Sequence, residues 1–453
     1  MKSKIKKIPD SIREILLAKK WKDVCWGMES QEDSIIFFTA KKLLDREELL
    51  QTNHYSILND KDSEDISGLK NVTLLDDDLF FDIQKESLNT VLPIEWENKK
   101  IIGITGTNGK TSVANFTEQL LNLNSCKAFS VGTLGVRSNN QDIDDINGMT
   151  TPDLINLHKC LFKHYHQHDI AVIEVSSHGV ALKRIWGLEF DIIAWTNFTQ
   201  DHLDFHETVE HYFQSKKTFF DNYLKKNGKR FVSDSDPDLL MKLDKKMFKQ
   251  AGPLDDEYFR LLPGHINSGF NLKNIELAYA IVSLFISKVN YLDRLQSVSG
   301  RFELTKKEEQ VFIIDYAHTP DALKNVLESA KRSFPDKEMH ILFGCGGDRD
   351  KTKRPLMGKI ADDLADVIYL TSDNPRTENP DSIINDIKDG IKNKKVTILS
   401  DRKSAIGLAI KNLPKKGCLI IAGKGHEDYQ IIGTEKKYFS DAAELKFFLG
   451  EGQ

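Results

Sequence analysis

Residues 101–112, which read IIGITGTNGKTS, carry the side chains whose types and spacing point most directly to chemistry. An apolar run ends in a turn between Gly106 and Gly109, and Lys110 and Thr111 follow at once. The backbone N–H groups of such a turn, together with the start of the helix after it, bind a phosphate group. The lysine ammonium would neutralise phosphate charge, and the threonine hydroxyl can bind Mg2+. The segment therefore predicts a phosphate-binding site.

One position departs from the common phosphate-binding turn. That turn has a glycine six residues before its lysine, where this chain has Ile104, so Gly106 and Gly109 alone provide the flexible backbone. The alternative is a glycine turn that joins a strand to a helix beside an incidental lysine. The residues that we expect to contact the phosphate groups here are Gly106, Thr107, Asn108, Gly109, Lys110, Thr111 and Ser112.

Two later apolar runs end in residues that suit a divalent cation. The run at 170–174 ends in Glu174, and the run at 190–196 is followed by a loop that contains His202 among acidic residues. Ligands of open α/β sheets gather at the carboxyl ends of the strands, so both side chains are candidate Mg2+ ligands. The alternatives are a solvated carboxylate at the sheet edge and a surface histidine.

A helical repeat follows the histidine loop. Tyr212 and Lys216 are four residues apart, so they share one face of a helix. A lysine ammonium that faces a metal ion is repelled by it. A role for Lys216 at a metal site would therefore require a change in its charge.

The loop DNPRTENP, at residues 373–380, is a further candidate site. Its Asn-Pro pair favours a turn after a strand. Arg376 would project a planar guanidinium, which can bind a carboxylate through two parallel hydrogen bonds. The alternative is an internal ion pair between Arg376 and Glu378 or Asp381.

The composition is typical of a globular enzyme with several domains. The 453 residues exceed what one hydrophobic core usually supports, so we expect two to four domains. The 68 acidic residues outnumber the 63 basic ones, and no arginine-rich tract occurs, which argues against nucleic acid as a partner. The five cysteines lack the spacing of a zinc site or a disulfide framework.

The sequence predicts neither a membrane span nor a signal peptide. The basic residues 1–21 favour a solvated amphipathic helix but lack the apolar core of a signal peptide. The longest apolar run, IELAYAIVSLFIS from Ile275, contains Glu276 and is too short to cross a bilayer. We therefore expect a cytoplasmic protein, and we expect it to be a monomer.

From residue 100 onward, short β-rich runs alternate with helical patterns, and we predict strands that begin at residues 101, 170, 190, 311, 340, 366, 396 and 418. This alternation predicts an α/β fold, with parallel sheets and helices on both faces. We predict three domains. They are a small divergent N-terminal domain at 1–97 with strand-like runs near 34, 53 and 72, a central P-loop-type domain at 98–298, and a C-terminal doubly wound, Rossmann-like domain at 299–453.

The motifs as a set resemble those of the Mur ligases, a family of ATP-dependent enzymes that form amide bonds. The resemblance covers about residues 100–445 and includes, in the family's order, GTNGKTS, TTPD, EVSSH, NFTQDHLDFH, YFQSK, GFNLKN, GRFE, DYAHTPDAL, FGCGGDRDKTKRP, DNPRTENP and AGKGHEDYQ. Within the family, the chain is similar to the members that add meso-diaminopimelate to the cell-wall precursor UDP-N-acetylmuramoyl-L-alanyl-D-glutamate.

This resemblance implies the catalytic and nucleotide-binding residues. Thr111 and Glu174 would bind one Mg2+ ion, and Glu174, His202 and a carbamylated Lys216 would bind a second. A carbamate is an anionic oxygen ligand, so it removes the electrostatic problem at Lys216. Lys110 would contact the β- and γ-phosphates of ATP. The further residues assigned to ATP binding are Asn271, Asn274, Arg301, Asp315 and His318. Taken singly, the asparagines could be helix caps and the charged residues ordinary ion-pair partners.

The resemblance also assigns both remaining substrates. The residues for the muramoyl-peptide are Thr150, Thr151, Ser176 and Arg184, and those for diaminopimelate are Arg349, Asp373, Asn374, Pro375, Arg376, Gly423 and Glu427. Arg376 would bind the carboxylate that diaminopimelate has and lysine lacks. In the implied reaction, ATP phosphorylates the γ-carboxylate of the D-Glu residue and the amine attacks the acyl phosphate.

Two features depart from the family. Leu182 stands where a glutamine is usual, two residues before Arg184, and residues 1–97 lack the Asp-Ser-Arg and Asp-Gly signatures of a uridine-binding domain. The alternatives are a ligase that uses L-lysine, a folylpolyglutamate synthetase, and a catalytically silent nucleotide-binding regulator. The DNPR motif argues against the first two, and the joint presence of the four catalytic residues argues against the third.

Overall fold

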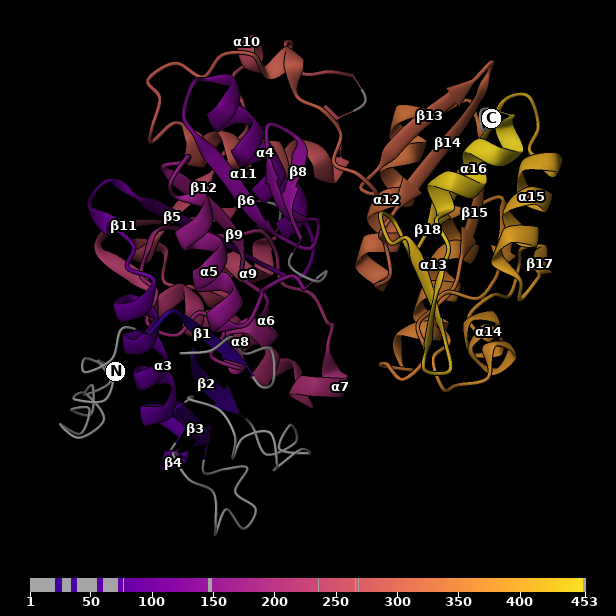
Figure 1. The fold of residues 1–453 in the computed structure, drawn as a ribbon. Helices are drawn as coiled ribbons and strands as arrows, with labels where there is room; N and C mark the ends of the chain where they lie inside the picture. Colours follow the sequence, from indigo (N-terminus) through magenta and orange to yellow (C-terminus); the bar gives the residue numbers. More distant parts are fainter. Residues whose placement is uncertain are drawn as a thin grey trace. The chain divides into compact units, whose positions relative to one another are not determined.

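The computed structural model describes residues 21–26, 34–38, 55–59, 72–75, 77–145, 149–234, 236–264, 266–267 and 269–450. The chain folds into an α/β structure with three larger sheets, which follow one another in the sequence, and a final two-stranded hairpin (Figure 1). Within the described part of the chain, no helix is long and apolar enough to cross a membrane. The amphipathic helix predicted near the N-terminus lies outside the described residues.

The first sheet contains four parallel strands in the order β1-β2-β3-β4. Its elements are β1 (Asp23–Trp26), β2 (Ser34–Phe38), β3 (Tyr55–Asn59) and β4 (Val72–Leu75), followed by helix α3 (Asp77–Val91). The three predicted strand-like runs correspond to β2, β3 and β4 and are confirmed. The sequence did not predict β1, because four residues are too few to show an alternating pattern. The sequence analysis also did not predict α3. This helix buries the polar residues Gln84 and Ser87, so its apolar residues do not follow a clear helical repeat.

This first sheet shares a hydrophobic core with a later helix, α5 (Leu154–His164). The core contains Val24, Ile35, Phe37, Phe80, Ile83, Leu88, Leu154 and Ile155, and Trp186 packs against it. A deletion of residues 1–97 would therefore expose apolar side chains of α5 to water.

The second sheet has eight strands in the order β12-β11-β10-β5-β9-β6-β7-β8. The strands are β5 (Lys100–Thr105), β6 (Ala128–Gly132), β7 (Gly135–Ser138), β8 (Gln141–Asp144), β9 (Ile170–Glu174), β10 (Phe190–Trp195), β11 (Leu224–Ser233) and β12 (Lys249–Ala251). Strand β5 pairs in parallel with β9, and Ile104 lies opposite Glu174. The carboxyl ends of these strands therefore lie at one edge of the sheet, as predicted.

Strands β7 and β8 differ from the parallel arrangement expected from the sequence, because both pair antiparallel with their neighbours. Asn139 and Asn140, between β7 and β8, have φ values of 52° and 59°. Two consecutive residues with positive φ form the type of turn that closes a two-residue hairpin. The antiparallel edge thus results from local turn geometry.

The helices and 3-10 turns between residues 96 and 298 vary in length. They are α4 (Lys110–Leu123), α5, α6 (Ser177–Ala181), α7 (Leu203–His206), α8 (Val209–Asn222), α9 (Pro237–Lys242), α10 (Asp256–Phe259) and α11 (Gly269–Val282), with 3-10 turns at Trp96–Asn98, Lys245–Met247 and Leu292–Arg294. Helix α4 packs along α11. Tyr212 and Lys216 both lie in α8, which confirms the predicted helix.

The third sheet has six strands in the order β13-β14-β18-β15-β16-β17. The strands are β13 (Glu303–Lys307), β14 (Gln310–Asp315), β15 (Glu338–Phe343), β16 (Val367–Leu370), β17 (Val396–Ile398) and β18 (Gly417–Ala422). Only β13 among these six pairs antiparallel, with β14. The predicted strands at 311, 340, 366, 396 and 418 are confirmed, whereas β13 was read only as part of a domain boundary.

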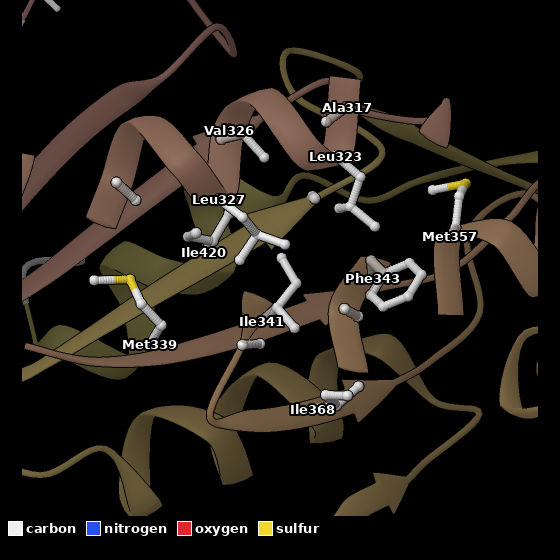
Figure 2. Packing of buried hydrophobic residues seen from close by; sticks show 14 of the residues in the cluster. Ala317, Leu323, Val326, Leu327, Met339, Ile341, Phe343, Met357, Ile368 and Ile420 are labelled. Carbon is white, nitrogen blue, oxygen red and sulfur yellow. The ribbon is translucent and has the colours of Figure 1, made fainter. Parts of the chain in front are cut away.

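Helices cover both faces of the third sheet, as expected for a doubly wound fold. They are α12 (Pro320–Ser333), α13 (Lys353–Leu364), α14 (Pro380–Lys388), α15 (Arg402–Asn412) and α16 (Asp441–Leu449), and the hairpin β19 (Tyr429–Ile432) and β20 (Glu435–Tyr438) precedes α16. Figure 2 shows one core, in which Leu323 and Leu327 of α12 point toward Ile341 and Phe343 of β15. Leu342, the intervening strand residue, belongs to the opposite core with α15 and α16.

By compactness the chain divides into two units. One contains Met1–Thr105, Ser125–Ile193 and Ser215–Arg230, and the other contains Gly106–Asn124, Ala194–Gln214 and Phe231–Gln453. The domain boundaries predicted at 97/98 and 298/299 remain predictions.

Candidate active site

Residues 106–109, which we call the glycine turn, join β5 to α4 in a shape that requires both of its glycines. Gly106 has a φ of 148° and Gly109 a φ of 83°. A Cβ atom on Gly106 would lie 1.8 Å from Thr196 Oγ1, and one on Gly109 would lie 2.5 Å from Asn274 Oδ1. Because both positions exclude a side chain and both have positive φ, only glycine fits the turn at these two residues.

Side chains after β10 brace the glycine turn. Asn197 accepts hydrogen bonds from the N–H of Thr107 through its backbone oxygen (3.0 Å) and from the N–H of Asn108 through its side chain (2.9 Å). Thr196 Oγ1 donates to the carbonyl oxygen of Asn108 at 2.5 Å, and Tyr212 donates to Thr107 Oγ1 at 3.1 Å. Sequence reasoning did not assign Thr196 or Asn197, although their place directly after a buried strand was a usable signal.

Lys110 lies over the turn that precedes it. Its Nζ atom donates to the carbonyl oxygens of Gly106 (3.0 Å) and Thr107 (2.9 Å). The next two residues, Thr111 and Ser112, begin α4 and are 4% and 2% exposed. A positive charge, two hydroxyl groups and a helix N-terminus are therefore arranged around one short turn, as a phosphate group requires.

Helix α11 and the bend just before β13 contribute buried polar atoms that have no hydrogen-bond partner among the described residues. These atoms are Asn271 Oδ1, Asn274 Nδ2 and Arg301 Nε. Asn274 packs against Gly109, and Arg301 Nη2 lies 3.3 Å from Thr111 Oγ1. Buried polar atoms without partners are uncommon in folded proteins, because each one costs about 1–3 kcal/mol. Their presence beside the glycine turn indicates a place for a polar ligand.

Arg301 and Asp315 lie close together, with His318 three residues further along the chain. The guanidinium of Arg301 stacks on the ring of Tyr316 at 4.2 Å. Asp315 accepts hydrogen bonds from the N–H groups of Phe302 (2.7 Å) and residue 317 (2.8 Å). Burial raises the pKa of Asp315 to about 6, although the charge of Arg301 opposes this rise.

His318 is held as a neutral imidazole. Burial, together with the charge of Lys353, lowers the pKa of His318 to about 4. Its Nδ1 lies 2.8 Å from the carbonyl oxygen of Tyr316, which can only accept, so Nδ1 carries the proton and Nε2 is an acceptor. His318 can therefore accept a hydrogen bond from a ligand.

Glu174, the last residue of β9, is buried and oriented by Thr133. Its two carboxylate oxygens accept from Thr133 N at 2.9 Å and from Thr133 Oγ1 at 3.3 Å. Thr133 Oγ1 also lies 2.9 Å from the hydroxyl of Thr150. A Cβ atom on Gly132 would lie 2.0 Å from Glu174 Oε1, so this carboxylate needs the glycine beside it.

The residues assigned to the muramoyl-peptide form a connected group around the end of β9. Thr151 Oγ1 donates to the carbonyl oxygen of Glu174 at 2.9 Å, and the N–H of Ser176 donates back to that hydroxyl at 2.9 Å. Arg184 Nη1 donates to the carbonyl oxygen of Thr151 at 2.7 Å. Leu182, where the family has a glutamine, has 44% of its surface exposed.

His202 and Lys216 belong to consecutive helices: His202 directly precedes α7, and Lys216 lies in α8. His202 has a φ of 54° at the start of α7, and its Nε2 lies 3.4 Å from Asp201 Oδ2. Burial would raise the pKa of Asp201, but the charges of His202 and Lys353 hold it below its usual value. Lys216 lies in α8 and is 1% exposed. Among the described residues, no three His, Cys, Asp or Glu side chains gather into a metal site, so the predicted metal ligands remain a prediction.

Residues 373–376, which we call the DNPR loop, follow β16. The guanidinium of Arg376 donates to the carbonyl oxygens of Gly347 (2.8 Å) and Asn374 (3.5 Å). The alternative ion pairs do not form, because Glu378 pairs with Arg354 (2.9 Å) and Asp381 accepts from a serine hydroxyl. Arg376 has a φ of 51°, so its backbone is fixed in an uncommon conformation.

The hairpin that begins with β19 holds the DNPR loop. Arg376 N donates to the carbonyl oxygen of Ile431 at 3.1 Å, and Gly433 N donates to the carbonyl oxygen of Arg376 at 2.8 Å. Gln430 Nε2 donates to the backbone oxygen of Asp373 at 2.6 Å. Sequence reasoning missed this hairpin, since its role depends on pairing between segments about 55 residues apart.

The other residues assigned to the amine substrate lie at the ends of β15, β16 and β18. Asn374 Nδ2 donates to Glu427 Oε2 at 3.0 Å. Gly423 has a φ of 113°, and a Cβ there would lie 2.4 Å from Asp373 Oδ2. Arg349 pairs with Asp204 at 3.4 Å on an exposed surface. A Cβ atom on Gly346 would lie 3.7 Å from Arg349 Cγ and 2.9 Å from Arg376 Nη1, so both arginines lie beside this glycine. Pro375 completes the loop, and a Cβ on Gly347 would lie 1.9 Å from its carbonyl oxygen.

Comparisons with known proteins agree with this geometry. Residues 104–252 match the model of the Mur ligase middle domain, and residues 300–425 match the model of the Mur ligase, glutamate ligase domain. The chain is 38% identical over 390 residues to UDP-N-acetylmuramoyl-L-alanyl-D-glutamate–2,6-diaminopimelate ligase of Leptospira interrogans, a match that covers 77% of this chain and 76% of that protein.

Solved structures show the same fold. A structure of a UDP-N-acetylmuramoyl-L-alanyl-D-glutamate–2,6-diaminopimelate ligase matches with a TM-score of 0.60 and 26% identity, over 95% of each chain. Folylpolyglutamate synthase of Mycobacterium tuberculosis matches with a TM-score of 0.58 and 16% identity, over 74% of this chain and 91% of that one, which shows a shared fold alone.

Proposed function

The chain belongs to the Mur ligase family, and from that premise we propose that it joins meso-diaminopimelate to the D-Glu residue of UDP-N-acetylmuramoyl-L-alanyl-D-glutamate. ATP supplies the energy, and the reaction yields the amide, ADP and inorganic phosphate. The relatives that carry this activity in their names match most of the chain, which supports the assignment.

The observation that carries the proposal is the set of partnerless polar atoms beside the glycine turn. Asn274 Nδ2 and Arg301 Nε are buried, and each belongs to a side chain that contacts the turn or the first residues of α4. A nucleoside triphosphate offers acceptor and donor groups for such atoms, while the turn takes its phosphates. Burying these atoms without partners costs free energy, and this cost is explained if ATP completes their hydrogen bonds.

In the proposed mechanism, phosphoryl transfer is the first step. An oxygen of the D-Glu γ-carboxylate attacks the γ-phosphorus of ATP, and ADP leaves. Lys110 and Arg301 would neutralise charge on the phosphates, and the glycine turn would hold them in line with the attacking oxygen. The amine of diaminopimelate then attacks the acyl carbon, loses a proton, and expels phosphate.

The donor set fits a hard divalent cation, and we propose Mg2+. Glu174 provides a fixed carboxylate and Thr111 a hydroxyl, and both are oxygen donors of the kind that Mg2+ prefers. Thr111 and Glu174 would hold one ion, and Glu174, His202 and Lys216 would hold a second. When bound, the ions would offset the negative charge of the phosphates.

Lys216 would take part as a carbamate. The ammonium loses one proton, and the neutral amine then adds to carbon dioxide and releases a second, so that an anionic group replaces a cationic one. The side chain is almost fully buried, and a buried ammonium is costly in a way that a metal-bound carbamate is not. Burial also protects a carbamate from hydrolysis, because water is excluded.

Substrate choice would depend on the DNPR loop. Among the described residues, the hydrogen bonds of the Arg376 guanidinium go to two backbone oxygens from one nitrogen, which leaves its remaining N–H groups for the second carboxylate of diaminopimelate. Asn374, Glu427 and Gly423 would bind the nearby amino-acid group, and Arg349 would add a charge from the neighbouring loop. L-Lysine lacks that carboxylate, which disfavours the lysine-adding alternative.

The acceptor would be held by Thr150, Thr151, Ser176 and Arg184 and by the first sheet, whose uridine contacts remain a prediction. Because the reaction consumes ATP, we place it in the cytoplasm, and we expect a monomer. The folylpolyglutamate alternative shares only the fold. The silent regulator is disfavoured because the glycine turn, Lys110 and the buried Glu174 are all in place.

An isotope experiment tests the reaction. The acceptor is labelled with 18O in its D-Glu γ-carboxylate and incubated with enzyme, ATP, Mg2+ and meso-diaminopimelate. The account predicts the tripeptide product, with one 18O atom in each inorganic phosphate released. Release of AMP, or phosphate without label, would overturn the acyl-phosphate route.

A further inference from the structure

Lys424 is a fully buried lysine at the carboxyl end of β18, and sequence analysis gave it no role. Its Nζ lies 3.1 Å from Glu427 Oε2, 3.3 Å from Asn374 Oδ1 and 4.0 Å from Asp373 Oδ1. It also lies 5.4 Å from the centre of the Tyr429 ring. A buried ammonium is costly unless it is paired and hydrogen-bonded. All three polar partners belong to residues that we assign to the amine substrate.

Lys424 fixes the orientation of the Asn374 amide. Asn374 Oδ1 accepts from Lys424 and from the N–H of Ile431 (2.9 Å), so this end of the amide must be the oxygen. The Nδ2 end consequently donates to Glu427 Oε2. Without Lys424, the amide would lose the charged donor that distinguishes its two ends.

Lys424 also limits the freedom of Glu427. Glu427 Oε2 accepts from both Lys424 and Asn374, while Oε1 lies 3.3 Å from the hydroxyl of Tyr316. Two hydrogen bonds on one oxygen hold the carboxylate in a single rotamer. The other oxygen, Oε1, is thereby kept at a defined position.

The net charge of Asp373, Glu427 and Lys424 suits one bound cationic group. Asp373 and Glu427 are two carboxylates, and Lys424 is one ammonium, so the three groups carry a net charge of −1. Arg402, a further buried cation, is already neutralised by Asp441, with contacts of 2.7 and 2.8 Å. Loss of Lys424 would remove the ammonium that lies 3.1 Å from Glu427 and 4.0 Å from Asp373, which costs energy and frees both carboxylates to move.

We propose that Lys424 is a positioning residue for the amine substrate, acting through Asn374 and Glu427. The inference rests on the proposed function, since it takes those two residues as substrate contacts. Lys424 sets their geometry before the substrate binds, and it has no part in phosphoryl transfer. It should therefore control the KM for the amine and not the KM values for ATP or the UDP-linked acceptor.

The test is Lys424→Met, which keeps the length of the side chain and removes its charge. We expect the KM for meso-diaminopimelate to rise about tenfold or more, because charge-assisted hydrogen bonds are lost. The KM values for ATP and the acceptor should change less than about twofold. Lys403→Met is the matched control, because Lys403 is half exposed and pairs with Glu444 on the surface. That variant should behave as the wild type.

A second variant shows whether Lys424 acts through its partner. In a Glu427→Gln background, Lys424→Met should raise the KM for the amine by a clearly smaller factor than in the wild type, since only the contact of Lys424 with Asn374 is left to lose. Equal effects in both backgrounds would overturn the proposal. An unchanged KM for the amine with a lower melting temperature would also overturn it, and would leave Lys424 a purely structural role.

Failure of the proposed function gives a different result. A wild-type enzyme that ligates L-lysine and not meso-diaminopimelate overturns the proposed substrate alone, and the same KM comparison is then made with lysine. A wild type that ligates no amine overturns both. If Lys424→Met does not fold, Lys424→Gln, which keeps a neutral N–H donor, is used for the same comparison and the same expected direction.

Discussion

The glycine turn and the DNPR loop differ in how the buried polar side chains around them are hydrogen-bonded. Near the turn, Asn274 Nδ2 and Arg301 Nε have no partner among the described residues. At the loop, Asn374 and Glu427 bond to each other and share Lys424. If ATP binds as proposed, it would complete the first region, whereas the side chains of the second already bond to one another without a ligand.

This difference follows from what each region must recognise. Triphosphates are bound largely by backbone N–H groups and a helix N-terminus, so few side chains need fixed orientations. An amino acid with two charged centres must be told apart from close analogues, which requires side chains held at defined angles. Substitutions in the turn should therefore affect the chemical step, and substitutions in the loop should affect the choice of amine.

The largest effect is expected for Lys110→Met. The substitution removes the ammonium that would neutralise the transferring phosphate, and loss of one such group costs about 10²–10³ in kcat. Phosphate release at saturating substrates measures the change. Lys163→Met is the control, because Lys163 is exposed and pairs with Asp144. A Lys110→Met enzyme with the wild-type kcat would contradict the assignment of the glycine turn.

Lys216→Ala should lower the rate by about 100-fold through loss of a metal-binding carbamate. Short carboxylic acids added to the assay should restore part of the activity, since they supply the missing anionic oxygens. The same acids should not restore Lys110→Met. Independently, 13C-labelled carbon dioxide should give a carbamate signal in the wild type that is absent from the variant. No rescue and no signal together would count against carbamylation.

Arg376→Ala should reduce kcat/KM for meso-diaminopimelate by about 30-fold or more, because a charge-assisted pair with the second carboxylate is lost. The kcat/KM for L-lysine should change little, so the ratio of the two kcat/KM values should fall by the same factor. Arg332→Ala, on the exposed face of α12, serves as the control. If the preference is unchanged, Arg376 does not read the second carboxylate.

The smallest effects come from a matched pair of asparagines, one in each region. Asn271→Ala should leave the free energy of unfolding nearly unchanged without nucleotide, because Oδ1 has no partner, and should raise the KM for ATP about fivefold. Asn374→Ala should lower the free energy of unfolding by about 1–3 kcal/mol, since Lys424 and Ile431 each lose an acceptor. Denaturant titration and initial rates measure both. The reverse pattern would refute the contrast between the regions.

Sequence reasoning succeeded where a function depends on neighbouring residues. The glycine turn, Lys110 and the start of α4 lie within a few positions, so their spacing alone predicted their arrangement. The alternation of strands and helices likewise predicted both covered faces of the third sheet. The covering helices bury alternate residues of β15, such as Ile341 and Leu342, in opposite cores.

Sequence reasoning failed where a function depends on contacts between segments that are far apart in the chain. Lys424 gains its role only when β18 and the DNPR loop meet across some 50 residues, and Gln430 reaches Asp373 over 57. The shared core of the first sheet with α5 was hidden for the same reason. The edge strands β8 and β13 depend on local turns, and the adjacent Asn139 and Asn140 before β8 are the sequence signal for the first of them.

A competition assay tests the central claim most directly. Equal concentrations of meso-diaminopimelate and L-lysine are supplied together with ATP, Mg2+ and UDP-N-acetylmuramoyl-L-alanyl-D-glutamate, and the two products are separated by mass. The account predicts ATP-dependent formation of the diaminopimelate product in an excess of about 30-fold or more, from the pair that only this amine can make with Arg376. Equal amounts of both products, or a predominance of the lysine product, would contradict it.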